Sequence, residues 1–246
     1  MDLTSPQGVD AALKNYGAVP DVLICTAGGS PTQGGFLADI SPDAIKSCLE
    51  LNYYTAIFIA QSCLKIWLAA PPSPSTRHIV FTSSTAAFVS LPGYIAYTPT
   101  KTAIRAVADT LRQELLLYGD KDTYQVHCFF PGTFLTDSFM QEQSHKAELT
   151  KIMEKSNAPI EELRTRTETV TSVAKKCIKG LEAEEFFTTV DFEGQLLLNN
   201  MRGPSPRDHG IVDVVIGWVA TVAWWFVRRD FDRQTLRYGR THLKSV

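Results

Sequence analysis

The sequence predicts an α/β fold with a doubly wound parallel sheet. Short apolar runs at 22–26, 78–83 and 125–130 are continuous rather than alternating, which is typical of strands buried on both faces of a parallel sheet. Segments with helical periodicity lie between these runs. The resulting β-α-β-α-β order favours this fold over an antiparallel sheet or a helical bundle.

The first strand, 22–26, ends at the small residues Ala27 and Gly28. Ser41 then supplies an N-cap, and Pro42 a first-turn proline, for a helix that runs to about residue 67. Its apolar stripe, which we expect to face the sheet, consists of Ile45, Leu49, Asn52, Ala56, Ile59, Cys63 and Trp67. A proline-rich loop closes this helix before the second strand, 78–83.

The second half of the chain continues the pattern. A helix is predicted from about Pro99 to Leu117, and its inward face is expected to carry Ala103, Val107, Leu111 and Leu115. The polar segment 137–166 is expected to be a mobile insertion or lid rather than core. A helix at 170–181 and a last strand at 186–190 follow. We assign residues 1–200 to one domain and 201–246 to a hydrophobic anchor with a basic tail.

Composition excludes several classes of protein. The 246 residues carry a net charge of −2, which provides no overall basic field for nucleic acid. The five cysteines are odd in number and show no CxxC spacing, and the sequence has no closely spaced pair of histidines. We therefore expect neither a disulfide scaffold nor a metal site. The N-terminus lacks the basic and apolar regions of a signal peptide, which favours a reducing, cytosol-facing location.

Tyr97 and Lys101 form the clearest chemical pair. Their i,i+4 spacing at a helix start places the ammonium beside the phenol, and a nearby cation lowers the pKa of a phenol. Tyr97 would then donate and accept protons near neutral pH. A solvated surface pair is the alternative explanation of this spacing.

Two further polar residues accompany this pair. Ser84 follows a predicted strand at its carboxyl end, where open α/β sheets bind ligands, and its hydroxyl could donate to a substrate carbonyl; turn formation is the alternative. Ser83 should point to the other face of the strand. Asn52 lies on an apolar stripe, so its amide is expected to be buried, with a purely structural role as the alternative.

Together these motifs resemble the short-chain dehydrogenase/reductase family. Their order along the chain is Cys25–Gly28, Asn52, Ser84, Tyr97 with Lys101, and Pro131–Thr136. The resemblance implies a Rossmann-like fold in which Tyr97 is the acid/base, Lys101 lowers its pKa and binds the nicotinamide ribose, Ser84 orients the carbonyl, and Asn52 holds a relay water. It also implies cofactor contacts from Asp2, Leu3, Ala27, Gly28, Pro131, Gly132, Phe134 and Thr136.

Within this family, residues 192–206 and the hydrophobic segment after them resemble members that act on long-chain keto-sphingoid bases. That resemblance implies NADPH as cofactor and the endoplasmic reticulum membrane as location. Alternatives are a reductase of another lipid ketone, such as a steroid or retinoid, and a non-catalytic membrane-associated fragment. The sequence leaves open whether the chain forms a homo-oligomer.

The start of the chain departs from the family pattern. The Gly-rich turn that holds a dinucleotide pyrophosphate does not precede Val22, and Asp2-Leu3-Thr4 resembles a segment that the family places after its third strand. We therefore expect the fold to be N-terminally incomplete by two βα units, roughly 60 residues. An exposed apolar sheet edge and weak NADPH binding would follow.

The segment Ile211–Val227 is strongly apolar and includes Trp218, Trp224 and Trp225, with Asp213 its one charged residue. As a helix it would be about 25 Å long, short of the roughly 30 Å hydrocarbon core. Arg202, Arg207 and a basic tail flank it, which pulls both ends toward the cytosol. We predict monotopic attachment to the cytosolic face of the endoplasmic reticulum, with a buried core helix as the alternative.

Overall fold

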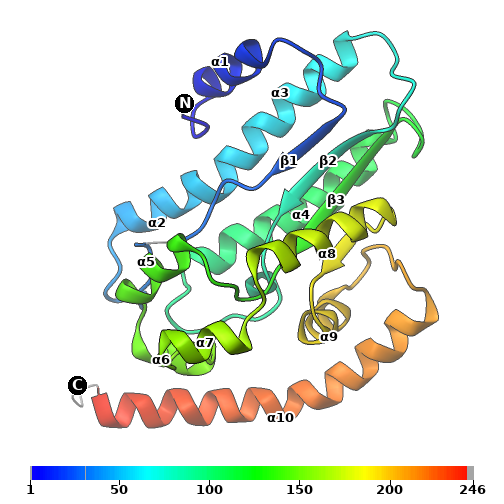
Figure 1. Cartoon of the computed structure of the whole chain (residues 1–246). Helices are drawn as coiled ribbons and strands as arrows, with labels where there is room; N and C mark the ends of the chain where they lie inside the picture. Colours follow the sequence, from blue (N-terminus) through cyan, green and yellow to red (C-terminus); the bar gives the residue numbers. More distant parts are fainter. Residues whose placement is uncertain (1, 31, 243–246) are drawn as a thin grey trace.

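A computed structural model describes residues 2–30 and 32–242 of the chain. Its sheet contains four parallel strands in the order β1-β2-β3-β4, as Figure 1 shows in part. The strands are β1 (Val22–Cys25), β2 (Arg77–Thr82), β3 (Tyr124–Phe130) and β4 (Phe187–Thr189). The predicted α/β class and parallel sheet are confirmed, with strand bounds within two residues of the expected ones.

Helices connect and cover these strands. Their bounds are α1 (Pro6–Tyr16), α2 (Pro42–Leu49), α3 (Thr55–Ala69), α4 (Tyr97–Leu115), α5 (Asp137–His145), α6 (Glu148–Met153), α7 (Ile160–Arg166), α8 (Val170–Glu182), α9 (Phe192–Met201) and α10 (Ile211–His242). A π-helical turn, η1 (Glu50–Tyr54), joins α2 to α3, and a 3-10 turn, η2 (Thr85–Ala87), follows β2.

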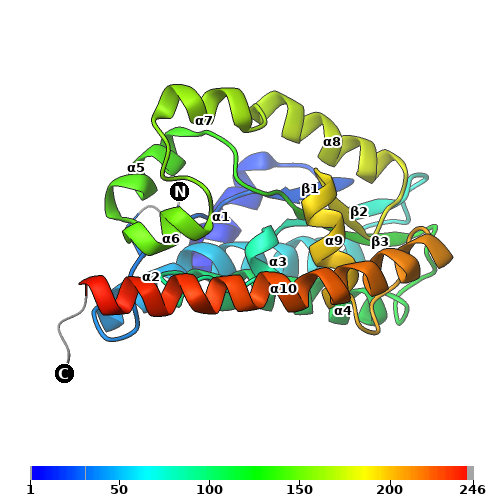
Figure 2. The same cartoon turned by 90° about the horizontal axis from the view of Figure 1, so that it is seen from below.

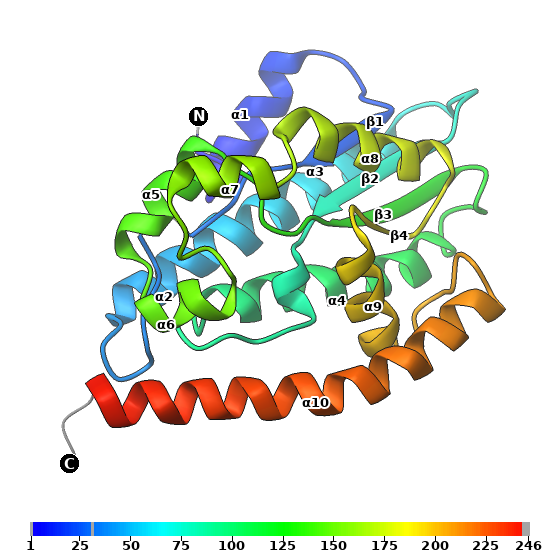
Figure 3. The same cartoon turned by 60° about the horizontal axis from the view of Figure 1, so that its bottom comes forward.

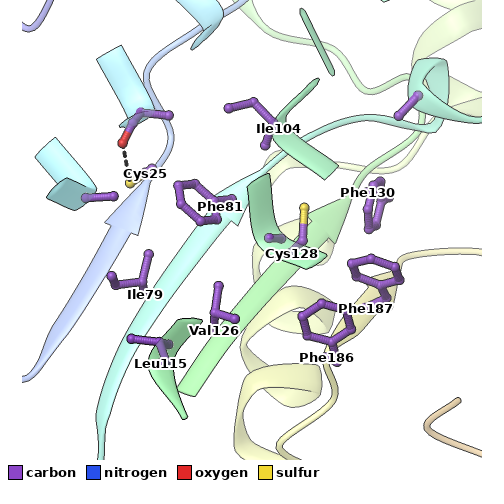
Figure 4. Packing of buried hydrophobic residues seen from close by; sticks show 14 of the residues in the cluster. Cys25, Ile79, Phe81, Ile104, Leu115, Val126, Cys128, Phe130, Phe186 and Phe187 are labelled. Carbon is purple, nitrogen blue, oxygen red and sulfur yellow. Dashed lines mark hydrogen bonds between the residues drawn. The ribbon is translucent and has the colours of Figure 1, made fainter. Parts of the chain in front are cut away.

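The core has one layer on each face of the sheet. On one face, side chains of α3 and α4 such as Trp67 and Ile104 pack with Ile79 and Phe81 of β2, and Figure 4 shows part of this layer. On the other face, a smaller cluster joins Val80 and Phe129 to α8 through Val173 and Cys177. These two layers make the sheet doubly wound. At its β1 edge, Val22 and Ile24 are exposed.

The helix expected from residue 42 to 67 is interrupted. The turn η1 lies between α2 and α3 and has a wider period than an α-helix. In α2, Cys48 is the buried side chain, and the predicted Ile45 and Leu49 are exposed. The predicted stripe is therefore wrong at its first two positions, because a continuous 3.6-residue period does not hold across a π-turn. The predicted inward face of α4 is shifted in a similar way. Of the predicted residues, only Leu115 is buried, and Ala103, Val107 and Leu111 are half-buried. The other buried residues of this helix are Thr100, Lys101, Ile104 and Ala108.

The segment 137–166 was expected to lie outside the core, and that expectation is wrong. It folds into α5, α6 and α7, which bury Leu149, Thr150, Met153 and Leu163. Its many charged residues suggested a solvated loop, but three of them pair with one another inside the protein, as described below.

The C-terminal helix α10 is much longer than the seventeen apolar residues of Ile211–Val227, because it continues through the basic residues to His242. It runs along one side of the molecule, past α9 and α6, in Figures 2 and 3. Arg202 does not flank it as a surface charge, since Arg202 is buried and pairs with Asp208 and Asp213. Arg207 is exposed, as expected.

Candidate active site

The predicted catalytic pair lies at the start of α4. Tyr97 is the first residue of this helix, and Lys101 follows one turn later. The Lys101 Nζ lies 5.6 Å from the centroid of the Tyr97 ring and donates a hydrogen bond of 3.2 Å to the carbonyl of Thr82. Because Thr82 is the last residue of β2, this bond ties the pair to the carboxyl end of the sheet.

The two serines after β2 have different partners. The Ser83 hydroxyl donates to the Lys101 carbonyl over 2.8 Å and is buried, so Ser83 fixes α4 to the strand. The Ser84 hydroxyl accepts from the Ala86 amide over 3.2 Å and caps η2. It also acts to lower the pKa of Tyr97, so Ser84 lies near Tyr97. The expected division of the two side chains thus agrees with their partners.

Asn52 holds the loop after β1. Its Nδ2 donates to the Gly29 carbonyl over 2.7 Å and to the Cys48 carbonyl over 2.9 Å, and its Oδ1 accepts from the Gly29 amide over 2.8 Å. These bonds match the structural role that was the alternative for this buried amide.

Gly28 is the point where this loop meets the catalytic pair. Its φ is 151°, and a Cβ built on it would lie 2.8 Å from Asn52 Oδ1 and 3.3 Å from Lys101 Nζ. Only a glycine fits between these two side chains. The loop after β1, η1 and α4 therefore converge at one place.

The pKa of Tyr97 is shifted in the direction opposite to the expected one. Burial raises it above its ordinary value, the carboxylate of Glu142 raises it further, and the Ser84 hydroxyl acts against these effects. Burial also lowers the pKa of Lys101 to about 8. A cation beside a phenol does not lower the pKa of that phenol when desolvation of the pair outweighs their attraction. Tyr97 is therefore fully protonated at neutral pH.

The loop Pro131–Thr136 follows β3 and lies next to the other segments, because the Pro131 carbonyl accepts from the Thr85 amide over 3.1 Å. Within it, the Thr136 hydroxyl caps α5 by accepting from the Phe139 amide, and Phe134 packs on the α8 side of the sheet. Asp2 precedes α1, where its carboxylate accepts from Thr4. The cofactor contacts expected of Asp2, Leu3, Ala27, Pro131, Gly132, Phe134 and Thr136 stay predictions.

The residues at the centre of the site fit the nicotinamide end of a dinucleotide. Gly28 leaves the space beside Lys101 free of a side chain, and the Lys101 ammonium is the kind of donor that a ribose hydroxyl accepts from. The half-buried Tyr97 and the Ser84 hydroxyl lie near them. The arrangement can orient a carbonyl group and give a proton to it.

Sequence reasoning missed Tyr94, which lies next to Tyr97, and three charged side chains that contact Tyr94. The ring centroid of Tyr94 lies 5.5 Å from that of Tyr97. The Tyr94 hydroxyl contacts the carboxylates of Glu142 and Glu154, and Lys146 forms ion pairs with both carboxylates. The i,i+4 spacing of Glu142 and Lys146 was a usable signal. It was not recognised because the surrounding segment is so polar.

The comparisons with known proteins agree with this geometry. Residues 1–147 match the family described as short chain dehydrogenase. The chain is 32% identical over 235 residues to a 3-ketodihydrosphingosine reductase of Neurospora crassa, which covers 94% of this chain and 62% of the relative. It is 34% identical over 241 residues to one of Aspergillus fumigatus, covering 92% and 63%. This chain belongs to the short-chain dehydrogenase family.

Solved structures show the same fold. A short-chain dehydrogenase from Streptomyces avermitilis superposes with a TM-score of 0.61 at 19% identity, covering 94% of this chain and 78% of that one. A short-chain dehydrogenase from Burkholderia cenocepacia in complex with NADP gives the same TM-score at 16% identity, covering 83% and 73%. Both confirm a Rossmann-like α/β fold. The chain spans 62% and 63% of the length of the two fungal relatives.

Proposed function

We propose that this protein reduces the 3-keto group of a long-chain sphingoid base, 3-ketodihydrosphingosine, with NADPH as hydride donor. The observation that carries the proposal is the convergence of Tyr97, Lys101 and Ser84 at the carboxyl end of the sheet in a short-chain dehydrogenase. The names of the fungal relatives supply the substrate class.

Each residue then has a defined task. Ser84 donates a hydrogen bond to the substrate carbonyl oxygen, and Tyr97 gives its proton to that oxygen as negative charge develops there. The raised pKa of Tyr97 suits this direction, because the phenol is present as the acid. NADPH, when bound, supplies the hydride. Lys101 holds the ribose end of the cofactor, and Asn52 fixes the loop that carries Gly28.

A substrate panel tests this proposal. Full-length protein is incubated with NADPH or NADH and with 3-ketodihydrosphingosine, a steroid ketone or a retinoid, and the products are quantified by mass spectrometry. We expect sphinganine to form with NADPH, and kcat/KM for the sphingoid ketone to exceed that for the other lipids at least about tenfold, the effect of about 1.4 kcal/mol. A preferred steroid or retinoid, or no turnover of the sphingoid ketone, would refute it.

We further propose that α10 lies in the plane of a membrane, on the cytosolic face of the endoplasmic reticulum. By length and composition, α10 is the one helix in the described part of the chain that could cross a membrane. One face of it carries a row of exposed apolar side chains, namely Ile211, Val212, Val215, Trp218, Val219, Val222, Trp225 and Phe226. Such a face favours insertion into the interfacial region of a bilayer.

The opposite face of α10 is attached to the catalytic domain. Asp213, Gly217 and Ala220 are buried, and a Cβ on Gly217 would lie 2.9 Å from the Asn199 carbonyl of α9. Crossing the bilayer upright would pull this face away from α9 and separate buried Asp213 from Arg202. At 32 residues the helix is also about 48 Å long, more than the roughly 30 Å hydrocarbon core needs.

Protease treatment of sealed microsomes containing C-terminally tagged protein tests this topology. We expect the tag to be digested and the protein to resist extraction by salt. A protected tag would mean a membrane-spanning helix, and release by salt alone would mean that no apolar anchor exists.

A further inference from the structure

Four side chains beside the candidate active site form a network, which we call the Tyr94 network: buried Tyr94 and Lys146 with half-buried Glu142 and Glu154. The Tyr94 hydroxyl lies 2.7 Å from Glu142 Oε1 and 2.9 Å from Glu154 Oε1. Lys146 Nζ pairs with both carboxylates, at 2.7 Å from Glu142 Oε1. Because a hydroxyl carries one hydrogen, Tyr94 can donate to only one carboxylate at a time.

The Tyr94 network holds more negative than positive charge. Two carboxylates surround one ammonium, and their side chains are 16% exposed against 1% for Lys146. The hydroxyls of Thr133 and Ser156 donate to Glu154 but bring no charge. An excess buried charge is costly, so a cation that arrives beside the network is attracted strongly.

This excess charge lies at the Tyr94 hydroxyl, and the ring centroid of Tyr94 is 5.5 Å from that of Tyr97. The Tyr94 and Tyr97 rings are neighbours, and the carboxylates of Glu142 and Glu154 both raise the pKa of Tyr97. Lys101 approaches the Tyr97 ring separately and is bonded to the end of β2, outside the Tyr94 network. Of the two carboxylates, Glu142 raises the pKa of Tyr97 more than Glu154 does.

An apolar hollow adjoins the same tyrosine. Phe36, Leu37, Leu91, Pro92 and Ile95 line it together with Tyr94. Tyr94 therefore separates an apolar surface from a buried cluster of charges. A ligand with an aliphatic chain and a cationic head group would match both sides of this residue.

We propose that Glu142, held in the Tyr94 network, is a specificity-determining residue that selects ketones with an ammonium group next to the carbonyl. The inference rests on the proposed function and deepens it. In a 2-amino-3-ketone, the carbon that bears the amine is bonded directly to the carbonyl carbon. Once Ser84 and Tyr97 bind the carbonyl oxygen, the ammonium group must lie close to Tyr97, where the Glu142 carboxylate attracts it.

Substrate selectivity tests the proposal. The kcat/KM of full-length protein is measured for 3-ketodihydrosphingosine and for a ketone of equal length in which hydrogen replaces the amine. We expect wild type to prefer the amino ketone and Glu142→Gln to reduce that preference by about tenfold or more, as for loss of a charge-assisted hydrogen bond. Asp208→Asn, a matched carboxylate-to-amide change in another buried ion network, should leave the preference unchanged.

The outcomes separate this inference from the proposed function. If wild type reduces both ketones equally well, or if Glu142→Gln keeps the wild-type preference, the inference is wrong and the reductase proposal stands. If wild type reduces neither ketone, both are wrong. Should Glu142→Gln fail to fold, product inhibition of wild type decides: sphinganine must inhibit about tenfold more tightly than its amine-free counterpart, and equal inhibition overturns the inference.

Discussion

Two ion networks, each with one cation and two carboxylates, lie in different parts of the molecule. In the Tyr94 network, Lys146 lies between Glu142 and Glu154, next to Tyr97. In the second, which we call the Arg202 network, Arg202 lies between Asp208 and Asp213 and joins the end of α9 to α10. Each places one cation between two carboxylates.

Location gives the two networks different consequences. The Arg202 network contacts backbone and helix ends: Asp208 accepts from the Phe186 amide, and Asp213 accepts from the His209 amide. Its charges are used to fasten α10 to the domain. The Tyr94 network instead raises the pKa of Tyr97, the proposed proton donor. The role of an ion network therefore has to be inferred from the residues around it. The charges alone do not show whether a network joins two helices or acts on a neighbouring titratable group.

The largest effect is expected from breaking the Arg202 network. Arg202→Met leaves two carboxylates buried without their cation, so the free energy of unfolding should fall by about 3–5 kcal/mol. Urea denaturation in mild detergent measures this change. Arg207→Met removes an exposed arginine five residues away and should change the unfolding free energy by less than about 0.5 kcal/mol. Equal losses in the two variants would show that the Arg202 network does not fasten α10.

A smaller effect is expected on the pH dependence of catalysis. Activity should fall in two steps at alkaline pH, first as Lys101, with its pKa of about 8, loses its proton, and then at higher pH as Tyr97 does. Glu142 is one cause of the raised pKa of Tyr97, and Glu142→Gln removes that cause, so the second alkaline fall of kcat/KM should begin at lower pH than in wild type. The amine-free ketone is used because it does not itself titrate. The remaining groups that act on Tyr97, namely Lys101, Cys48, Glu154 and Ser84, are unchanged.

The control for this measurement comes from the other network. Asp208→Asn alters a half-buried carboxylate that pairs with Arg202 and should leave the alkaline fall where it is in wild type. If Glu142→Gln also leaves it unchanged, the Tyr94 network has no electrostatic effect on Tyr97, and the comparison between the two networks loses its basis.

The sequence predicted the sheet and the pair Tyr97 and Lys101 because both depend on local patterns. Continuous apolar runs identify strands buried on two faces, and an i,i+4 spacing at a helix start places two side chains together. Ser84 and Asn52 were also found, since each follows from its position at a strand end or on a helix stripe. The structural bonds of Asn52 to Gly29 were the alternative already considered.

The rest depends on contacts between distant segments. Tyr94 and Glu154 are sixty positions apart, and only the folded chain brings them together. Charged residues between 137 and 166 suggest solvent exposure unless their partners are known. The π-turn at Glu50–Tyr54 and the length of α10 were missed because a single helical period and an apolar window describe neither.

The smallest effect concerns a pair of histidines, His78 and His127, of which His127 is buried. His78 Nδ1 lies 3.0 Å from His127 Nε2, and His127 Nδ1 lies 2.8 Å from the Glu185 carbonyl. Burial lowers the pKa of both histidines, so they bind protons more readily when the chain is unfolded. Stability should therefore decline as pH falls through the unfolded-state pKa of about 6.5.

Unfolding titrations of wild type and His127→Gln between neutral pH and about pH 5 check this expectation, since the unfolded-state histidine titrates in that window. The variant should lose less stability than wild type over that interval, whatever its stability at neutral pH. An equal or steeper decline in the variant would contradict the neutral, buried state of His127.

Replacement of Tyr97 by phenylalanine tests the central claim most directly. Tyr97→Phe removes only the hydroxyl, so the NADPH-dependent kcat of full-length protein with 3-ketodihydrosphingosine should fall about 100-fold or more, while the Kd for NADPH stays near the wild-type value. A variant that keeps more than about a tenth of wild-type kcat would contradict the role of Tyr97 as proton donor, and with it the account of the site.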